Sequence, residues 1–551
     1  MTGLRALTRL EATGPPSPPA GAGRVRPRRR GWLWALGWLV VLGWATVGLL
    51  PPGGQVVNPA GWNFLADFWA HALRPELDPA FLRTTWEATL TTVAFAVLGT
   101  VGAVLLGVLG APWMSETWWA PTSGRPVGRV LRRGGLVLSR VVAALPRGVH
   151  EAVWGLLLVS VLGRDPLVAV VAIAVPFGAI TAKVYSELLD EADHRPYEQL
   201  RTAGAGRLTA VTYGLLPGLL PAATSYAFYR FECAIRSAVI LGMVGAGGLG
   251  LQLSLSFAGL QYAELWTAVY ALVLLGAAVD RWGLLLRQRR GQRRGRGRFS
   301  LAVGALLVVL SVWHLGPDPA RWVSGRTADQ LVRLREALVP PALPAGGWAE
   351  LGRRAVETLQ MSVLAISLAS LLGVLVALVA ARQPAGSRAS WRGLLGWAAR
   401  QVLLLTRALP PPVWALLVLF VVFPGPLPGA LALGIYTFGI LGRLFAEVVE
   451  ELDQRPRQAL VGMGARPGVA LAYASLPAAL GQLVALSLYR WEVTARETVV
   501  VGVVGAGGLG RLLEQQRSAF DYPGMAGTVL ALIAVCLLVD LVSLAVRASL
   551  R

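Results

Sequence analysis

The sequence repeats itself at a constant interval of 260 residues. Within residues 229–250 and 489–510, thirteen of twenty-two positions are identical, and the run Val244–Gly250 recurs unchanged as Val504–Gly510. A long repeat at a fixed interval indicates a duplicated structural unit. The chain must therefore fold as two halves of one design.

Long apolar runs occupy most of both halves. The mean hydropathy is +0.58, 55% of the residues are hydrophobic and only 15% are charged, which is typical of a membrane protein. A helix needs about 20 apolar residues to cross the hydrocarbon core of a bilayer. The runs predict helices near residues 32–50, 86–110, 136–162, 166–186, 218–243 and 264–286, then 299–315, 357–380, 398–423, 427–445, 478–503 and 526–547. We therefore expect an all-α polytopic membrane protein with about twelve transmembrane helices in two six-helix repeats, which are parallel because six is even.

The formal net charge of +21 comes from arginines that lie between the apolar runs. Arg24–Arg30, Arg125–Arg133 and Arg287–Arg298 follow the distribution of cytoplasmic loops under the positive-inside rule, so we expect no nucleic-acid partner. This pattern predicts a multi-pass protein of the bacterial inner membrane with both termini in the cytoplasm. The predicted domains are a disordered basic tail (1–30), a first transmembrane domain (31–286), a basic cytoplasmic linker (287–298) and a second transmembrane domain (299–551).

A polar segment separates the fourth and fifth predicted helices of each half, and both segments share one spacing. The matching positions are Glu198, Gly204, Leu216 and Pro217 in the first half, and Gln458, Gly464, Leu476 and Pro477 in the second. Glycine permits a sharp turn, and proline favours the first turn of a helix. The spacing predicts a short helix, a glycine turn and a second short helix on the cytoplasmic side.

Charged side chains stand near the middle of the fifth predicted helix of each half. With neighbouring tyrosines they form a candidate substrate path of Tyr229, Arg230, Glu232 and Arg236, and of Tyr489, Arg490, Glu492 and Arg496. A charge at the bilayer centre costs at least roughly 2.5–3.5 kcal/mol, so these groups should pair or face a watery cavity. The four-residue spacing predicts ion pairs of Glu232 with Arg236 and of Glu492 with Arg496.

The arginines in excess over these pairs predict a positive lining through which a small anion could pass. The alternative is that the charges are structural and hold helices together inside the bundle. Ser237 stands where the second half has Glu497, which argues against a uniform positive ring.

A glycine-rich run follows this helix in each half. Its glycines are Gly245, Gly247, Gly248 and Gly250, with Gly505, Gly507, Gly508 and Gly510 in the second half. Such a run weakens a helix and is tolerated at membrane depth only beside protein or a water-filled path, so we predict a gate or a sharp re-entry. A phosphate-binding loop is excluded because no Gly-Lys-Ser/Thr follows.

Catalytic residues, metal ligands and cofactor-binding motifs are not indicated. Cys233 and Cys536 lie apart in apolar stretches, and the chain has only four histidines, which are His71, His150, His194 and His314. An enzyme acting on lipid phosphate would need a paired histidine and carboxylate or a metal cluster. We therefore expect a protein that is not an enzyme and carries no cofactor.

These motifs together resemble the phosphonate transport permease family (PhnE-type) of ABC importers. The resemblance rests on the glycine turns, which are similar to the EAA loop of importer permeases, on the Tyr-Arg-Phe/Trp-Glu segments, on the paired Val-Gly-Ala-Gly-Gly-Leu-Gly run and on Pro412–Leu416. It implies an importer permease (MetI-like) fold with two permease domains fused in one chain. It also implies that the glycine turns dock on two cytoplasmic ABC ATPase subunits and that a periplasmic binding protein delivers the substrate.

The resemblance implies alternating-access import of a phosphonate or a related phosphorus oxyanion such as phosphite or phosphate. The motifs leave the choice among these anions open. Two alternatives also stay open: a secondary transporter with a central basic site and no ATPase, and an ABC permease for another small solute such as methionine.

Overall fold

Helices are the only regular elements in the part of the chain that the structure describes, apart from an isolated β bridge between Val57 and Val422. This computed structural model describes residues 31–50, 55–119, 126–163, 165–287, 294–316, 325–381 and 391–550. The predicted tail and the middle of the predicted linker, residues 288–293, lie outside these ranges. The domain boundaries therefore stay a prediction.

Long helices alternate with short ones in each half. The elements of the first half are α2 (Gly31–Leu49), α3 (Gly61–His71), α4 (Pro79–Met114), α5 (Glu116–Trp119), α6 (Pro126–Gly148), α7 (Glu151–Leu162), α8 (Pro166–Asp190), α9 (Arg195–Thr202), α10 (Arg207–Ala210), the π-helical turn η2 (Val211–Leu215), α11 (Leu216–Leu241), the π-helical turn η3 (Gly242–Ala246), α12 (Gly248–Ala258) and α13 (Tyr262–Arg287). Those of the second half are α14 (Arg294–Leu315), α16 (Gly325–Leu338), α17 (Gly347–Ala380), α18 (Trp391–Ala408), α19 (Pro411–Val421), α20 (Pro426–Glu451), α21 (Arg455–Gly462), α22 (Pro467–Ala470), η4 (Leu471–Ser475), α23 (Leu476–Val501), η5 (Gly502–Ala506), α24 (Gly508–Ser518) and α25 (Tyr522–Leu550). From α8 and α20 onward the elements correspond one to one, as the sequence repeat predicts.

Most of the predicted membrane spans are present among the described residues as helices of sufficient length and apolar composition. Seven helices are long and apolar enough to cross a membrane, and three bent helix pairs raise this number to ten. Two shorter apolar helices, Leu33–Leu49 and Ser300–Leu315, lie at the first predicted span of each half and are shorter than these spans.

The third predicted helix of each half is in fact two helices, so the prediction of one continuous helix is wrong there. The chain bends by 75° between α6 and α7 and by 98° between α18 and α19. In the second half Pro410, Pro411 and Pro412 lie at the bend, and proline lacks the N–H that a continuing helix needs. In the first half the His150 side chain accepts a hydrogen bond from the Ala152 N–H at 3.2 Å and so begins α7.

Close packing of α4 on α8 forms the centre of the first half. A Cβ added at Gly99 would lie 2.8 Å from Ile173 Cγ2, and one at Gly107 would lie 2.4 Å from Thr181 Cγ2. Small residues let membrane helices approach closely, and dispersion contacts then hold them together.

The first helix of each half packs on the other half. α2 lies along α17, where Trp38 Nε1 donates to Ser367 Oγ at 3.0 Å and the Trp38 ring meets Trp491 edge to face at 5.2 Å. Conversely, α14 lies along α4, where the His314 ring bonds to Thr91 Oγ1 at 3.0 Å. The two halves are therefore interlocked by an exchange of helices, which the sequence did not indicate.

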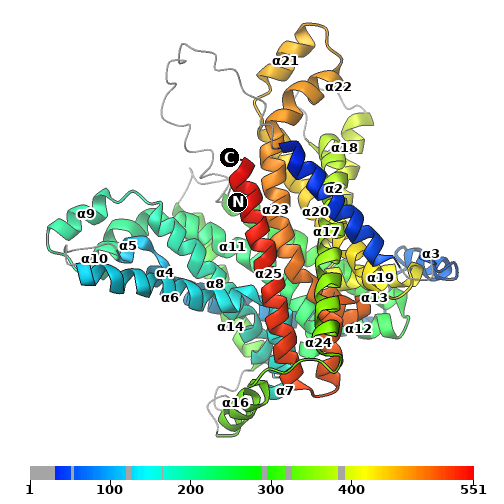
Figure 1. Ribbon diagram of the computed structural model, residues 1–551, viewed down its shortest axis with the longest axis horizontal. Helices are drawn as coiled ribbons and strands as arrows, with labels where there is room; N and C mark the ends of the chain where they lie inside the picture. The colour runs from blue at the N-terminus through cyan, green and yellow to red at the C-terminus, as the bar shows by residue number, and fades with distance from the viewer. Residues whose placement is uncertain are drawn as a thin grey trace.

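Figure 1 shows how the two halves are arranged. The helices α4, α6 and α8 run toward the left and carry α9 and α10 near their far end, whereas α23 runs toward the top and carries α21 and α22. The short helix, glycine turn and second short helix predicted for residues 198–217 and 458–477 are thus confirmed as α9–α10 and α21–α22. Each pair projects from its half at the end of the long helices.

Candidate functional site

The charged residues predicted for the path lie on α11 and α23, and both helices reach across to the other half. Arg236 on α11 donates through Nη1 to the Tyr436 hydroxyl of α20 at 3.4 Å. Arg496 on α23 donates through Nη1 to the backbone oxygen of Arg147, at the end of α6, at 3.3 Å. These arginines therefore lie where the halves meet.

Only one of the two predicted ion pairs is present. Arg236 Nη2 lies 3.2 Å from Glu232 Oε1, which confirms the first pair. The second prediction is wrong, because the Glu492 carboxylate bonds to Arg547 of α25, and Arg496 Nε donates instead to the Glu492 backbone oxygen at 3.1 Å. An arginine from the last helix thus takes the carboxylate that helical spacing assigned to Arg496.

Arg230 and Arg490 occupy equivalent positions but have different surroundings. Arg490 Nη2 donates to both carboxylate oxygens of Glu497 at 2.9 Å, and its guanidinium lies 5.4 Å from the centre of the Tyr436 ring. Arg230 donates through Nε and Nη2 to the Tyr226 hydroxyl at 2.8 and 2.7 Å. The Glu497 carboxylate neutralises the charge of Arg490, whereas the Tyr226 hydroxyl does not neutralise that of Arg230.

Glu232 and Arg236 belong to a larger group of charged residues between the halves, and the other three members were not singled out from the sequence. This interhalf charge cluster consists of Glu232, Arg236, Asp280, Arg407 and Arg443. Arg407 of α18 pairs with Asp280 of α13 at 2.6 Å and lies 4.0 Å from Glu232, while Arg443 lies 3.7 Å from Asp280. Its members other than Arg443 line a cavity together with apolar side chains of α11, α13 and α18.

A signal for this cluster was present in the repeat. Arg147 and Asp540 are the counterparts of Arg407 and Asp280 at the interval of 260 residues. They also interact electrostatically across the halves, with Arg147 on α6 and Asp540 on α25. Charges that recur in register within apolar runs would have identified both groups.

The replacement of Glu497 by Ser237 in the first half is partly compensated by another carboxylate. Ser237 Oγ donates to Glu151 Oε1 of α7 at 2.6 Å, and the position equivalent to Glu151 in the second half is Pro411. Both halves therefore have a carboxylate here, namely Glu151 beside Ser237 in the first half and Glu497 itself in the second. Only Glu497 pairs with an arginine of the predicted path.

The glycine-rich runs break the helix, as predicted. Gly245 and Gly247 have φ values of 111° and 109°, and Gly505 and Gly507 have 101° and 87°, a conformation that other residues rarely adopt. The helix restarts where the Thr92 hydroxyl accepts a hydrogen bond from the Leu249 N–H at 2.9 Å. The axis bends by 57° at this break in the first half. Whether the break opens and closes as a gate stays a prediction.

Gly250 and Gly510 are required for a different reason, namely close backbone packing. A Cβ at Gly250 would lie 1.9 Å from the Val239 oxygen, and one at Gly510 would lie 2.4 Å from the Val499 oxygen. We expect Gly250→Ala to lower the free energy of unfolding by roughly 1–3 kcal/mol through overpacking, measured as a lower melting temperature of the purified chain in detergent.

Gly218→Ala is the matched control for this substitution. Gly218 lies in α11, and a Cβ there would meet no atom within 4 Å. Alanine is favoured over glycine in a helix by roughly 0.5–1 kcal/mol, so this variant should melt no lower than the wild type. Equal melting temperatures for Gly250→Ala and the wild type would contradict the packing argument.

The glycine turns between α9 and α10 and between α21 and α22 have nearly identical geometry. Gly204 and Gly464 have φ values of 87° and 90°, and a Cβ at either would meet no atom within 4 Å. Conformation alone therefore requires glycine there. Pro217 and Pro477 lie in the first turn of α11 and α23, as predicted, each directly after a π-helical turn.

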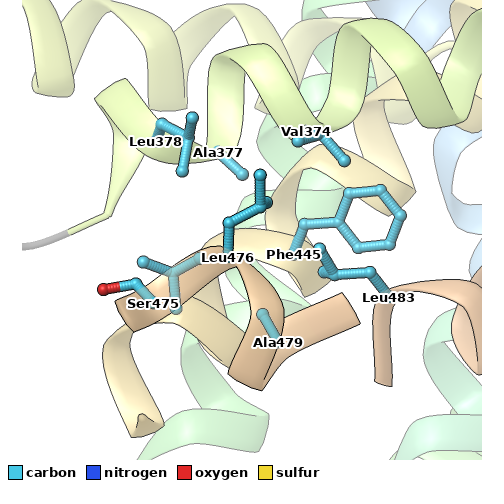
Figure 2. A pocket seen from close by; sticks show the side chains of 9 residues that line it. Val374, Ala377, Leu378, Phe445, Ser475, Leu476, Ala479 and Leu483 are labelled. Carbon is cyan, nitrogen blue, oxygen red and sulfur yellow. The ribbon is translucent and has the colours of Figure 1, made fainter. Parts of the chain in front are cut away.

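Figure 2 shows an apolar pocket between α17, α20, the end of η4 and the start of α23. Phe445, Leu476 and Leu483 are among its lining side chains, and Ser475 supplies its polar one. Such a lining offers no charge to an anion. In contrast with the cavity at the interhalf charge cluster, this pocket is lined by apolar side chains and one hydroxyl.

Metal ligands do not cluster among the described residues, where no three histidine, cysteine or carboxylate side chains gather in a way that could hold an ion. Cys233 and Cys536 are both free thiols.

The chain matches the family model described as "Binding-protein-dependent transport system inner membrane component" twice, over residues 103–292 and 369–551. It is 29% identical over 409 residues to the "Phosphate-import permease protein PhnE" of Mycolicibacterium smegmatis, covering 72% of this chain and 75% of that protein. It is 32% identical over 250 residues to the "Phosphite transport system permease protein PtxC" of Stutzerimonas stutzeri, covering 45% of this chain and 87% of that protein. Among solved structures, a chain of the MetNI methionine ABC transporter shares 20% identity with a TM-score of 0.33, covering 36% of this chain and 96% of that one.

Proposed function

Because the chain belongs to the family of binding-protein-dependent transport system inner membrane components, we propose that it is the permease of an ATP-driven importer for a phosphorus oxyanion. It carries the family domain twice, so one chain supplies both halves of the path. It is a transport protein rather than an enzyme. Relatives named for phosphate and phosphite transport favour a phosphonate, phosphite or phosphate substrate over methionine.

The single observation that best supports an anionic substrate is the buried guanidinium of Arg230 at the predicted path. It donates to a tyrosine hydroxyl and lies over aromatic rings, without a carboxylate of the described residues in ion-pairing distance. A cation that is buried in the membrane interior without a carboxylate partner is stabilised when an anion reaches it. The path of Tyr229, Arg230, Glu232 and Arg236 with Tyr489, Arg490, Glu492 and Arg496 remains our proposal for the route.

Partners follow from the family in general, and their number and positions are part of the proposal. Two ATPase subunits dock on the projecting pairs α9–α10 and α21–α22, and a periplasmic binding protein docks at the opposite face. This orientation puts both termini in the cytoplasm. Closure of the ATPase subunits moves the two pairs, and the halves then rock about the contacts between α11, α18, α20 and α23. The glycine breaks at 245–248 and 505–508 act as the gate.

Uptake into proteoliposomes tests this function. The chain, reconstituted with its ATPase and binding protein, should accumulate at least one of methylphosphonate, phosphite and phosphate when ATP is supplied to the ATPase face, and should not accumulate methionine. A catalytically inactive ATPase should abolish uptake. Accumulation driven by an ion gradient without the ATPase would identify a secondary transporter and overturn the proposal.

A further inference from the structure

The two halves differ at two positions that decide how the arginine of the Tyr-Arg-aromatic-Glu segment is held. Four residues before this arginine, the first half has Tyr226 and the second has Leu486. Seven residues after it, the first half has Ser237 and the second has Glu497. Each half therefore offers its arginine one helical partner, a hydroxyl in the first and a carboxylate in the second.

In the second half these positions produce a neutral pair. Both oxygens of Glu497 accept hydrogen bonds from Arg490 Nη2, and the two side chains are only 10% and 11% exposed. An ion pair of this kind has little net charge to attract an anion. The charge of Arg490 is thus paired with Glu497 through Nη2, although its buried Nε has no hydrogen-bond partner among the described residues.

In the first half the arginine keeps its charge. Its guanidinium carbon lies 5.0 Å from the centre of the Phe177 ring, 5.1 Å from that of Tyr226 and 5.7 Å from that of Tyr229. Aromatic faces attract a cation without neutralising it. Among the side chains that the structure describes, no carboxylate pairs with Arg230.

Hydrogen-bond donors remain available on both Arg230 and Tyr226. Arg230 uses Nε and Nη2 for the Tyr226 hydroxyl, and its Nη1 donates to no described residue. The Tyr226 hydroxyl accepts both bonds, and its own proton has no acceptor among the described residues. A guanidinium N–H and a phenol O–H, adjacent to each other and enclosed by aromatic rings, match two oxygens of one small tetrahedral oxyanion.

We propose that Arg230 and Tyr226 form the one anion-binding site of the path, so that the first half selects the substrate and the second half does not. The inference rests on the proposed function and refines it, because it assigns binding to one half of a duplicated chain. The aromatic enclosure favours a small phosphorus oxyanion such as phosphite or methylphosphonate over a larger phosphate ester.

The experiment compares uptake of phosphite and methylphosphonate by the complete reconstituted importer carrying different variants. Arg230→Gln should lower uptake at least tenfold, since a charge-assisted contact to the anion is lost. Arg490→Gln combined with Glu497→Gln removes a neutral pair and should lower uptake less than threefold. Arg517→Gln, which removes an arginine that pairs only with Glu514 among described carboxylates, is the surface control.

Tyr226→Phe keeps the aromatic ring and nearly the same volume, so this variant tests the hydroxyl without disturbing the fold. It should raise the half-saturating substrate concentration several-fold while the melting temperature stays near that of the wild type. Arg230→Lys should fall between wild type and Arg230→Gln.

The outcomes separate this inference from the proposed function. A wild-type importer that accumulates none of the phosphorus oxyanions overturns both. If the wild-type importer is functional, two results overturn only the assignment to the first half. One is that Arg230→Gln loses no more uptake than the Arg490 and Glu497 double variant. The other is that Tyr226→Phe leaves the half-saturating substrate concentration unchanged.

Discussion

Replacing Arg407 with glutamine is expected to destabilise the chain by about 3–5 kcal/mol, because it leaves a carboxylate buried between the halves without its nearest cation. Arg407 Nη2 lies 2.6 Å from Asp280 Oδ2, and these side chains are 14% and 20% exposed. Arg443 remains 3.7 Å from Asp280, which places the effect toward the lower end of this range. In a detergent melt of the purified chain the melting temperature should fall by roughly 3–4 °C.

The double variant Arg407→Gln with Asp280→Asn is the control. It removes both charges and keeps hydrogen-bonding groups of similar size, so most of the lost stability should return. An additive loss from the two substitutions would show that the pair does not act as a unit. Because the pair joins α18 of the second half to α13 of the first, we expect even the rescued variant to transport with altered kinetics, since rocking of the halves changes this contact.

Replacing Gly204 and Gly464 together with proline is expected to lower substrate-stimulated ATP hydrolysis at least tenfold. Proline fixes φ near −65°, whereas these residues have φ values of 87° and 90°. The turns between α9 and α10 and between α21 and α22 must then rearrange, and the proposed ATPase contact is lost. The measurement is the phosphate-release rate of the reconstituted complex with and without the loaded binding protein.

Gly206→Pro is the matched control in the same turn. Gly206 has φ −60° and ψ 159°, which proline adopts without strain. This variant should keep stimulation close to the wild-type value. Full stimulation in the Gly204 and Gly464 double variant would remove both turns from the coupling mechanism.

Much of the fold could be predicted because apolar length and the repeat are local properties of a sequence. The helices near residues 166–186 and 427–445 correspond to α8 and α20, and the positive φ of Gly204 and Gly464 follows from a glycine between two short helices. The bends before α7 and α19 were missed since both sides of each bend are apolar, and hydropathy does not report a change of axis. The prolines at positions 410–412 would have indicated the second bend.

The candidate site was predicted less completely, because pairing depends on residues far apart in the chain. The Glu232 and Arg236 pair is local and was found. Arg547 reaches Glu492 from 55 residues away, and Arg407 reaches Asp280 from 127 residues away, so helical spacing contained no information about either contact. The different surroundings of Arg230 and Arg490 are nevertheless visible in the sequence as Tyr226 against Leu486 and Ser237 against Glu497.

The position of α2 on α17 has a consequence for how the chain is made. Trp38 contacts Ser367, which the ribosome adds 329 residues later. At about 5–20 residues per second, α2 waits in the bilayer for on the order of tens of seconds before its docking surface exists. Other helices are inserted and begin to pack in that interval, so biogenesis must keep an early, strongly apolar segment unpaired until the final half emerges.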